Sequence, residues 1–150
     1  MHPLTYTALA FLTAVYVTGC AQTRPIPRSI TIQDGVPSTY TASAVSNIVA
    51  HTLSAWAAKY GDATSRDIKT LSCLDVYITK DSVNGHLYGV ADVFLPRITV
   101  WAHSQNPADS AIVHEIIHVL RFIQAGDADN SHSGAWWGAG FESPVKDSLR

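Results

Sequence analysis

The segment from Asn106 to Gly126 constrains the fold more than any other part of the chain, because it carries the signals of one long helix. Asn106 can cap the helix, Pro107 suits its first position, and Gly126 can end it. The apolar residues in this segment recur at helical spacing; they are Ile112, Ile116, Val119, Leu120 and Ile123. We therefore expect a helix over residues 107–125 with one face in the core.

Shorter patterns of two kinds precede this helix. Apolar residues recur at helical spacing over residues 42–60, which predicts an N-terminal helix. Runs rich in β-branched and aromatic residues predict short strands at 74–79, 86–94 and 97–101, and a further short strand fits residues 29–33. Residues 127–150 contain several glycines and a proline, so we expect a mostly irregular C-terminal segment.

Length and composition bound the class of protein. The chain has 150 residues, of which 47% are hydrophobic, so it can build one packed domain and is not a disordered chain. The formal charge of −2 argues against nucleic acid as a partner, because binding to phosphates needs a basic surface. We expect an α+β monomer with an N-terminal helix, a three- to four-stranded sheet, the long helix and an irregular C-terminal segment.

The start of the chain has the pattern of a targeting segment. Residues 4–17 carry no charge and are mostly apolar. They are too few to cross a bilayer, which takes about 20 residues, but they suit the apolar part of a secretory signal. The residues Val17-Thr18-Gly19-Cys20 that follow resemble the bacterial lipobox. This resemblance implies cleavage before Cys20 and lipidation of its thiol, whereas the alternative is a buried N-terminal helix.

The lipobox resemblance also divides the chain and places the protein. It implies a lipoprotein signal peptide over 1–19, a tether over 20–40 and a folded domain over 41–150. The residue after Cys20 is alanine and not aspartate, which by resemblance to lipoprotein sorting favours the outer membrane. We therefore expect a protein of the bacterial cell envelope, held by lipid at the outer membrane or the periplasmic face rather than in the cytoplasm.

The chemistry of the chain concentrates in His114-Glu115-Ile116-Ile117-His118, an H-E-x-x-H motif within the long helix. Histidines four positions apart lie on the same helix face, so both imidazoles can bind one ion. Glu115 is rotated by about 100° from His114, so it lies beside the metal rather than on it. In that place it can take a proton from a metal-activated water. The alternative interpretation is a pair of histidines on a solvated helix face.

The order of helix, strands and then an H-E-x-x-H helix resembles the zincin metallopeptidases. The resemblance covers about residues 42–132, and only the five-residue motif is specific. It implies a small zincin-like fold, a Zn²⁺ cofactor and a peptide or protein substrate. In that family a strand before the active-site helix runs beside the cleft and binds extended substrate, and residues 97–101 match that place.

The third metal ligand does not follow from a known zincin pattern. The metzincin pattern needs Gly and His where this chain has Arg121 and Gln124. The thermolysin-like pattern needs an Asp four residues after a downstream Glu, but Lys146 stands there after Glu142.

His132 is the candidate that we favour. The helix carries the chain about 10 Å beyond His118 at 1.5 Å per residue, and residues 127–132 can reach back about 20 Å when extended. We therefore predict a metal site of His114, His118 and His132. The alternative third ligands are Asp127, Asp129 and Glu142.

Several neighbours of the motif are candidates for supporting roles. Asp127 and Asp129 could accept the second N–H of a metal-bound imidazole, as carboxylates often do. Trp136 and Trp137 lie near His132 in the sequence and are either cleft walls or, as we favour, core residues. Tyr88 and His103 could stabilise an oxyanion, although no spacing supports either.

Two functions from different classes fit these patterns. The first is an envelope-anchored zinc-dependent peptidase in which Glu115 acts as general base. The second is a non-catalytic zinc-binding envelope lipoprotein with a zincin-like fold; an interaction module is a weaker third interpretation. Glu115 favours the enzyme, because hydrolysis needs a carboxylate at that position and metal binding does not.

Overall fold

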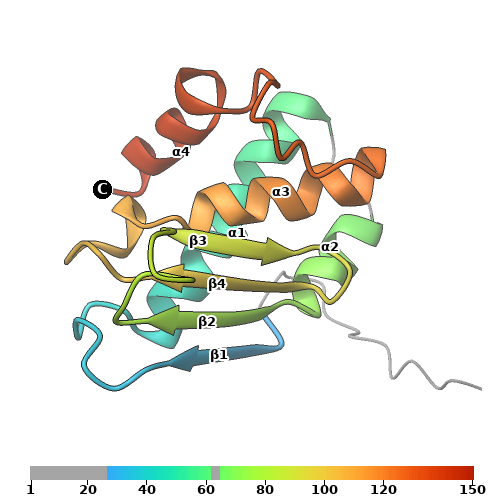
Figure 1. The fold of residues 1–150 in the computed structure, drawn as a ribbon. Helices are drawn as coiled ribbons and strands as arrows, with labels where there is room; N and C mark the ends of the chain where they lie inside the picture. The colour runs from blue at the N-terminus through green and yellow to red at the C-terminus, as the bar shows by residue number, and fades with distance from the viewer. Residues whose placement is uncertain (1–26, 62–64) are drawn as a thin grey trace, which may run out of the picture.

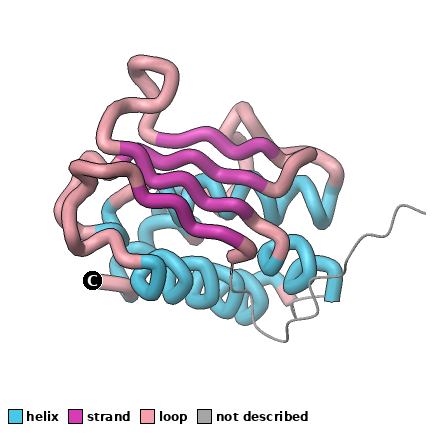
Figure 2. The backbone as a smooth tube through the Cα atoms, turned by 90° about the horizontal axis from the view of Figure 1, so that it is seen from below, coloured by secondary structure: helices cyan, strands magenta, loops and turns pink. Residues whose placement is uncertain are grey.

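The computed structural model describes residues 27–61 and 65–150, which form an α+β domain (Figure 1). The predicted signal peptide and Cys20 lie outside the described residues. The helices pack on one face of a four-stranded sheet (Figure 2). Within the described residues, no helix is long and apolar enough to cross a membrane.

The two main helices follow the sequence pattern closely. Helix α1, Ala42–Tyr60, begins after Thr41, whose side chain accepts a hydrogen bond from the Ala44 N–H. Helix α3, Ile112–Ala125, ends at Gly126 with a left-handed φ of 71°. The first residues of the predicted long helix form instead a short 3₁₀ turn, η1, over Pro107–Asp109, capped by Asn106. The start of α3 is therefore later than predicted.

The sheet has an order that the sequence did not predict. Its strands are β1 (Ser29–Ile32), β2 (Asp75–Thr79), β3 (Gly89–Asp92) and β4 (Arg97–Trp101), in the order β1-β2-β4-β3. Strand β2 is parallel to both of its neighbours, β1 and β4, and β3 is antiparallel to β4. The edge strand beside α3 is therefore β3. The expectation that 97–101 borders the cleft is wrong, because β4 is paired on both of its sides.

The folded domain includes part of the predicted tether. Strand β1 pairs with β2, and Arg28 donates to the Asp75 carboxylate from both its Nε, at 2.9 Å, and a terminal nitrogen. Tyr40 lies in the core with 3% of its surface exposed. The domain therefore begins before residue 41.

Two further helices correct the sequence analysis. Helix α2, Ser65–Ser72, lies in a stretch for which no element was predicted, and helix α4, Glu142–Ser148, lies in the segment expected to be irregular. Pro144 is compatible with α4 because it stands in the first turn, where backbone N–H groups have no partner within the helix. Phe141 and Val145 are buried, and they fix α4 against the rest of the domain.

The core lies between the sheet and the helices. Its fully buried side chains come from β2 and β4, from α1 and from α3; they include Val76, Ile78, Ile98, Val100, Val49, Trp56, Ile112, Ile116 and Leu120. Because α3 contributes its apolar face to this core, its other face is held at a fixed height above β3. That face carries the H-E-x-x-H motif.

Candidate metal centre

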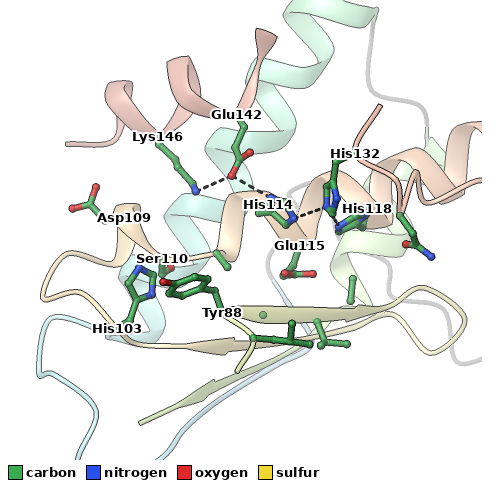
Figure 3. A pocket seen from close by; sticks show the side chains of 16 residues that line it. Tyr88, His103, Asp109, Ser110, His114, Glu115, His118, His132, Glu142 and Lys146 are labelled. Carbon is green, nitrogen blue, oxygen red and sulfur yellow. Dashed lines mark hydrogen bonds and ion pairs between the residues drawn. The ribbon is translucent and has the colours of Figure 1, made fainter. Parts of the chain in front are cut away.

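Three histidines come together above β3 (Figure 3). His114 and His118 lie one turn apart on α3, and His132 reaches them from the loop that follows the helix. The Nε2 atom of His132 is 3.0 Å from Nε2 of His114 and 3.2 Å from Nε2 of His118. The three predicted ligands therefore converge on one point and could bind a metal ion.

The second nitrogen of each helix histidine has an acceptor. Nδ1 of His118 is 2.6 Å from the Ala128 carbonyl oxygen, and Nδ1 of His114 is 3.3 Å from Oε1 of Glu142. These acceptors place the ring proton on Nδ1, so each Nε2 directs a lone pair toward the shared point. Burial lowers the pKa of His118, although the bond to Ala128 opposes the shift, and this favours the neutral ligand form.

The spacing of the nitrogens fits zinc. A tetrahedral zinc ion lies about 2.0–2.1 Å from each imidazole nitrogen, which separates the nitrogens by about 3.3 Å. The two Nε2 distances of 3.0 and 3.2 Å are close to that value. Two lone pairs that face each other in this way also need a cation or a proton between them. The chemistry of the donor set therefore suits an ion that prefers imidazole and leaves one position for another ligand.

Glu115 lies on α3 between the two helix histidines and faces β3. Its surface is only 4% exposed, and it is not among the three side chains that converge. A Cβ atom at Gly89 of β3 would lie 2.5 Å from Oε1 of Glu115, so the carboxyl group fills the space that glycine leaves. Burial raises the pKa of Glu115 to about 7, against the opposing effect of His114. A carboxyl group with this pKa can both accept and donate a proton near neutral pH.

The loop that carries His132 is built around Asp129. One carboxylate oxygen accepts bonds from the Ser131 hydroxyl and from both the N–H and the hydroxyl of Ser133, at 3.0–3.1 Å. The other accepts from the Gly134 N–H and the indole N–H groups of Trp136 and Trp137, at 2.7–2.8 Å. Burial would raise the pKa of Asp129, but these donors outweigh it and hold that pKa well below its usual range.

The same loop contains two residues with left-handed backbone, Asp129 with φ 50° and His132 with φ 54°. Such a conformation is uncommon for residues other than glycine and persists where the surroundings enforce it. The six donors on Asp129 provide that enforcement. The arrangement therefore fixes the position from which His132 approaches the other two histidines.

Asp127 and Asp129 do not have the supporting role that the sequence suggested. Asp127 accepts the backbone N–H of Asp129 at 2.9 Å, which shapes the turn, and Asp129 holds the loop. For the two helix histidines, the acceptors of the imidazole N–H groups are instead Glu142 and the Ala128 carbonyl. In the sequence, Glu142 was a candidate only as an alternative third ligand. The only sequence feature that singles out Glu142 is that it is the one glutamate besides Glu115.

Glu142 is in turn held by α4. Lys146, one turn along the helix, donates to the same oxygen at 2.8 Å. Burial would raise the pKa of Glu142, but the bonds to His114 and Lys146 lower it to about 2. The carboxylate therefore stays charged beside His114.

Trp137 packs on the histidines as well as on the core. Its ring centroid lies 4.5–4.7 Å from those of His114, His118 and His132. Trp136 instead packs near Trp56 and beneath the guanidinium group of Arg121, and both tryptophans are partly buried against the core. The preferred interpretation as core residues was therefore incomplete for Trp137, which forms one wall of the histidine cluster.

A cavity of about 610 Å³ opens from the histidines along the edge of β3. Tyr88 and His103 line its other end, together with Asp109 (Figure 3). Tyr88 is 57% exposed. Its ring stacks on Trp101 with centroids 5.5 Å apart, and its centroid lies 4.7 Å from that of the His103 ring. The structure thus places both of these predicted candidates in the same cavity as the three histidines, and it leaves room there for a ligand.

The described residues thus define an α+β domain with a three-histidine centre and a buried carboxyl group beside an open sheet edge. In comparisons with known proteins, no family model, no curated protein and no solved structure matches the chain.

Proposed function

We propose that the protein is an envelope-anchored zinc-dependent peptidase of the zincin type. The observation that carries the proposal is the convergence of His114, His118 and His132 with the buried Glu115 beside them. Cys20 would carry the lipid that attaches the domain to the membrane of a bacterial envelope. The substrate would be a peptide or a protein.

The chemistry divides between the metal and the chain. Zinc, when held by the three histidines, would supply an acidified water and polarise the carbonyl group of the substrate. Glu115 accepts the proton of the attacking water and then donates it to the leaving amine. Its pKa of about 7 suits both directions of transfer. Glu142 and the Ala128 carbonyl keep the helix histidines in the tautomer that binds metal.

The open edge of β3 suits an extended peptide. Among the described strands, β3 pairs only with β4, so the backbone groups on its other side are available. A peptide can add to such an edge as a further strand, which aligns its carbonyl groups along the cleft. The cavity beside the histidines then accommodates a side chain of the substrate.

The alternative function is a zincin-like zinc-binding lipoprotein without catalysis. Glu115 favours the enzyme over this alternative, because burying a carboxyl group is unfavourable and Glu115 is not needed to hold the metal. Glu142 supports zinc binding under either function and so does not distinguish them.

The test is to compare the full-length protein with its Glu115→Gln variant. We expect both proteins to bind one zinc ion per chain, measured by metal analysis after purification. Only the unsubstituted protein should cleave a mixed peptide library, and the loss in Glu115→Gln should be at least 10²–10⁴-fold. Zinc binding with no cleavage by either protein would favour the non-catalytic alternative. Loss of zinc from Glu115→Gln would contradict the role given to Glu115.

A further inference from the structure

The turn between β3 and β4 exposes two large apolar side chains. Phe94 is 81% exposed and Leu95 is 61% exposed, more than any other large apolar residue among those described. The Asp92 carboxylate accepts the backbone N–H groups of both residues, at 3.1 and 3.0 Å. Phe94 also makes a T-shaped contact with Phe122 on α3, with ring centroids 5.0 Å apart. We call Phe94 and Leu95 the apolar tip; a defined turn holds it outward.

The apolar tip lies at the end of the sheet where the chain enters the domain. Ser29, the first residue of β1, is in register with Asp75, and Asp75 is in register with Arg97. Arg97 pairs with Asp92, the last residue of β3. The turn from Asp92 to Arg97 therefore projects from the same end of the sheet as the start of β1 (Figure 1).

The segment between Cys20 and β1 is short. Arg28 lies eight residues after Cys20, and eight residues span at most about 26–29 Å. Three strand spacings of about 4.8 Å separate β1 from β3, which puts the tip about 14 Å across the sheet from Ser29. A membrane that holds a lipid on Cys20 is therefore within reach of the tip.

Basic side chains surround the same end of the sheet. Arg28 and Arg97 are exposed and lie there by register. Helix α2 leads into β2 at this end and carries the exposed Arg66 and Lys69. The acidic side chains at this end by register are Asp75, which pairs with Arg28, and Asp92, which accepts the N–H groups of the tip. Asp127, which follows Gly126 at the end of α3, is also exposed. An apolar pair with several basic neighbours is the composition that favours a surface of anionic lipid.

We propose that the apolar tip inserts into the headgroup region of the membrane to which Cys20 is anchored. This inference goes beyond the peptidase function, but it rests on the proposed lipid on Cys20, which identifies a membrane as the surface that the apolar tip contacts. It also narrows the substrate class. Gly89, which lies against Glu115, is three residues along β3 from Asp92, or about 10 Å farther from the membrane. Membrane-proximal segments of neighbouring proteins would then be within reach of the cleft.

The experiment measures where the tip lies relative to lipid. The full chain is produced in a bacterial host, purified in detergent and reconstituted into vesicles of phosphatidylethanolamine and phosphatidylglycerol. In a Cys73→Ser background, Phe94→Cys and Leu95→Cys each receive an environment-sensitive fluorophore. Leu95→Cys preserves the contact between Phe94 and Phe122. The matched control is Asp81→Cys, an exposed position just beyond the opposite end of β2.

We expect a nitroxide on the lipid chains to quench both tip probes, with aqueous iodide quenching them only weakly. The control at position 81 should show the reverse. If the tip probes respond like the control, the proposal is overturned. If both tip probes are shielded from both quenchers, a protein surface covers the tip and the proposal is again overturned.

The number of fluorophores per chain separates this inference from the lipid anchor. One fluorophore per chain means that Cys20 is blocked, whereas two mean that Cys20 is unmodified and that the anchor is wrong. In the second case the same probes are read in a Cys20→Ser background after vesicles are added. Quenching of the tip by the lipid nitroxide then still supports insertion, and its absence overturns it. Neither outcome depends on peptidase activity.

Discussion

Replacing Gly89 by alanine tests the position of the Glu115 carboxyl group, the proposed general base, directly. The added Cβ would lie 2.5 Å from Oε1 of Glu115, 2.9 Å from its Cγ and 3.0 Å from its Cδ. Ordinary carbon contacts are about 3.5–4.0 Å, so Glu115 has to move by about 0.5–1 Å. Because the clash involves Cγ as well as the oxygen, rotation of the carboxyl group alone does not relieve it.

The expected cost of this displacement is large for activity and moderate for stability. A misplacement of about 1 Å can reduce a rate by about 10²-fold, so kcat/KM for peptide hydrolysis should fall to that extent. Overpacking of a buried site costs about 1–3 kcal/mol in the free energy of unfolding. The zinc content should not change, because the three atoms nearest to the new Cβ all belong to Glu115, which is not a predicted ligand.

A double-mutant cycle decides whether the methyl group acts through Glu115. Gly89→Ala is measured in the natural sequence and in a Glu115→Ala background, with unfolding followed in denaturant. The destabilisation should be present in the first background and largely absent in the second, where the clashing side chain has been removed. Equal destabilisation in both backgrounds, or full peptidase activity in Gly89→Ala, would refute the reasoning. This readout does not require the protein to be a peptidase.

Three further predictions concern the loop, the sheet and the anchor. Asp129→Asn should weaken zinc binding by about 10–100-fold, although Asp129 touches no imidazole, and His132→Ala should weaken it by at least ~100-fold. A titration against a competing chelator measures both affinities. Unchanged zinc affinity in Asp129→Asn would contradict the role of the loop. The hydrogen bond from Arg28 lowers the pKa of Asp75 in the folded protein. The ionised carboxylate therefore stabilises the fold fully at pH values above the unfolded pKa of about 3.9, and this stabilisation is lost as the pH falls through the lower pKa of the folded state. Asp75→Asn should therefore flatten the acid side of the stability profile, and an unchanged profile would exclude this contribution. Cys20→Ser should abolish membrane fractionation, and retained fractionation with unchanged processing would show that the lipobox interpretation is wrong.

Local patterns in the sequence predicted the elements that depend on local chemistry. The bounds of α1 and β4 agree with the predicted ranges 42–60 and 97–101. Thr41 and Gly61 define α1 through backbone groups only a few residues away, which is why a sequence reveals them. The H-E-x-x-H pair is of the same kind, because the spacing of His114 and His118 determines that both face one side of α3.

The features that the sequence did not predict depend on distant partners. The strand order β1-β2-β4-β3 follows from which strands pair, and the composition of a strand does not encode its neighbours. Helix α2 is short and polar, and its placement depends on the buried Leu71. Helix α4 contains Pro144, which reads as a breaker unless the helix start is known to lie at Glu142. The cleft was consequently expected beside residues 97–101, whereas the edge strand is β3, which lies within the predicted strand 86–94.

The loop after α3 shows how the position of His132 beside His114 and His118 could be predicted for an incomplete reason. Chain length allowed His132 to return to the helix, but it allowed many other positions as well. What selects one position is the carboxylate of Asp129, whose six donors come from residues 131–137 and close the loop on itself. A metal ligand on a loop binds well only if the loop is ordered before the ion arrives, since otherwise binding has to offset the entropy of ordering it. Asp129 therefore contributes to the metal centre through the shape of the loop, and its replacement should weaken zinc binding even though every histidine remains.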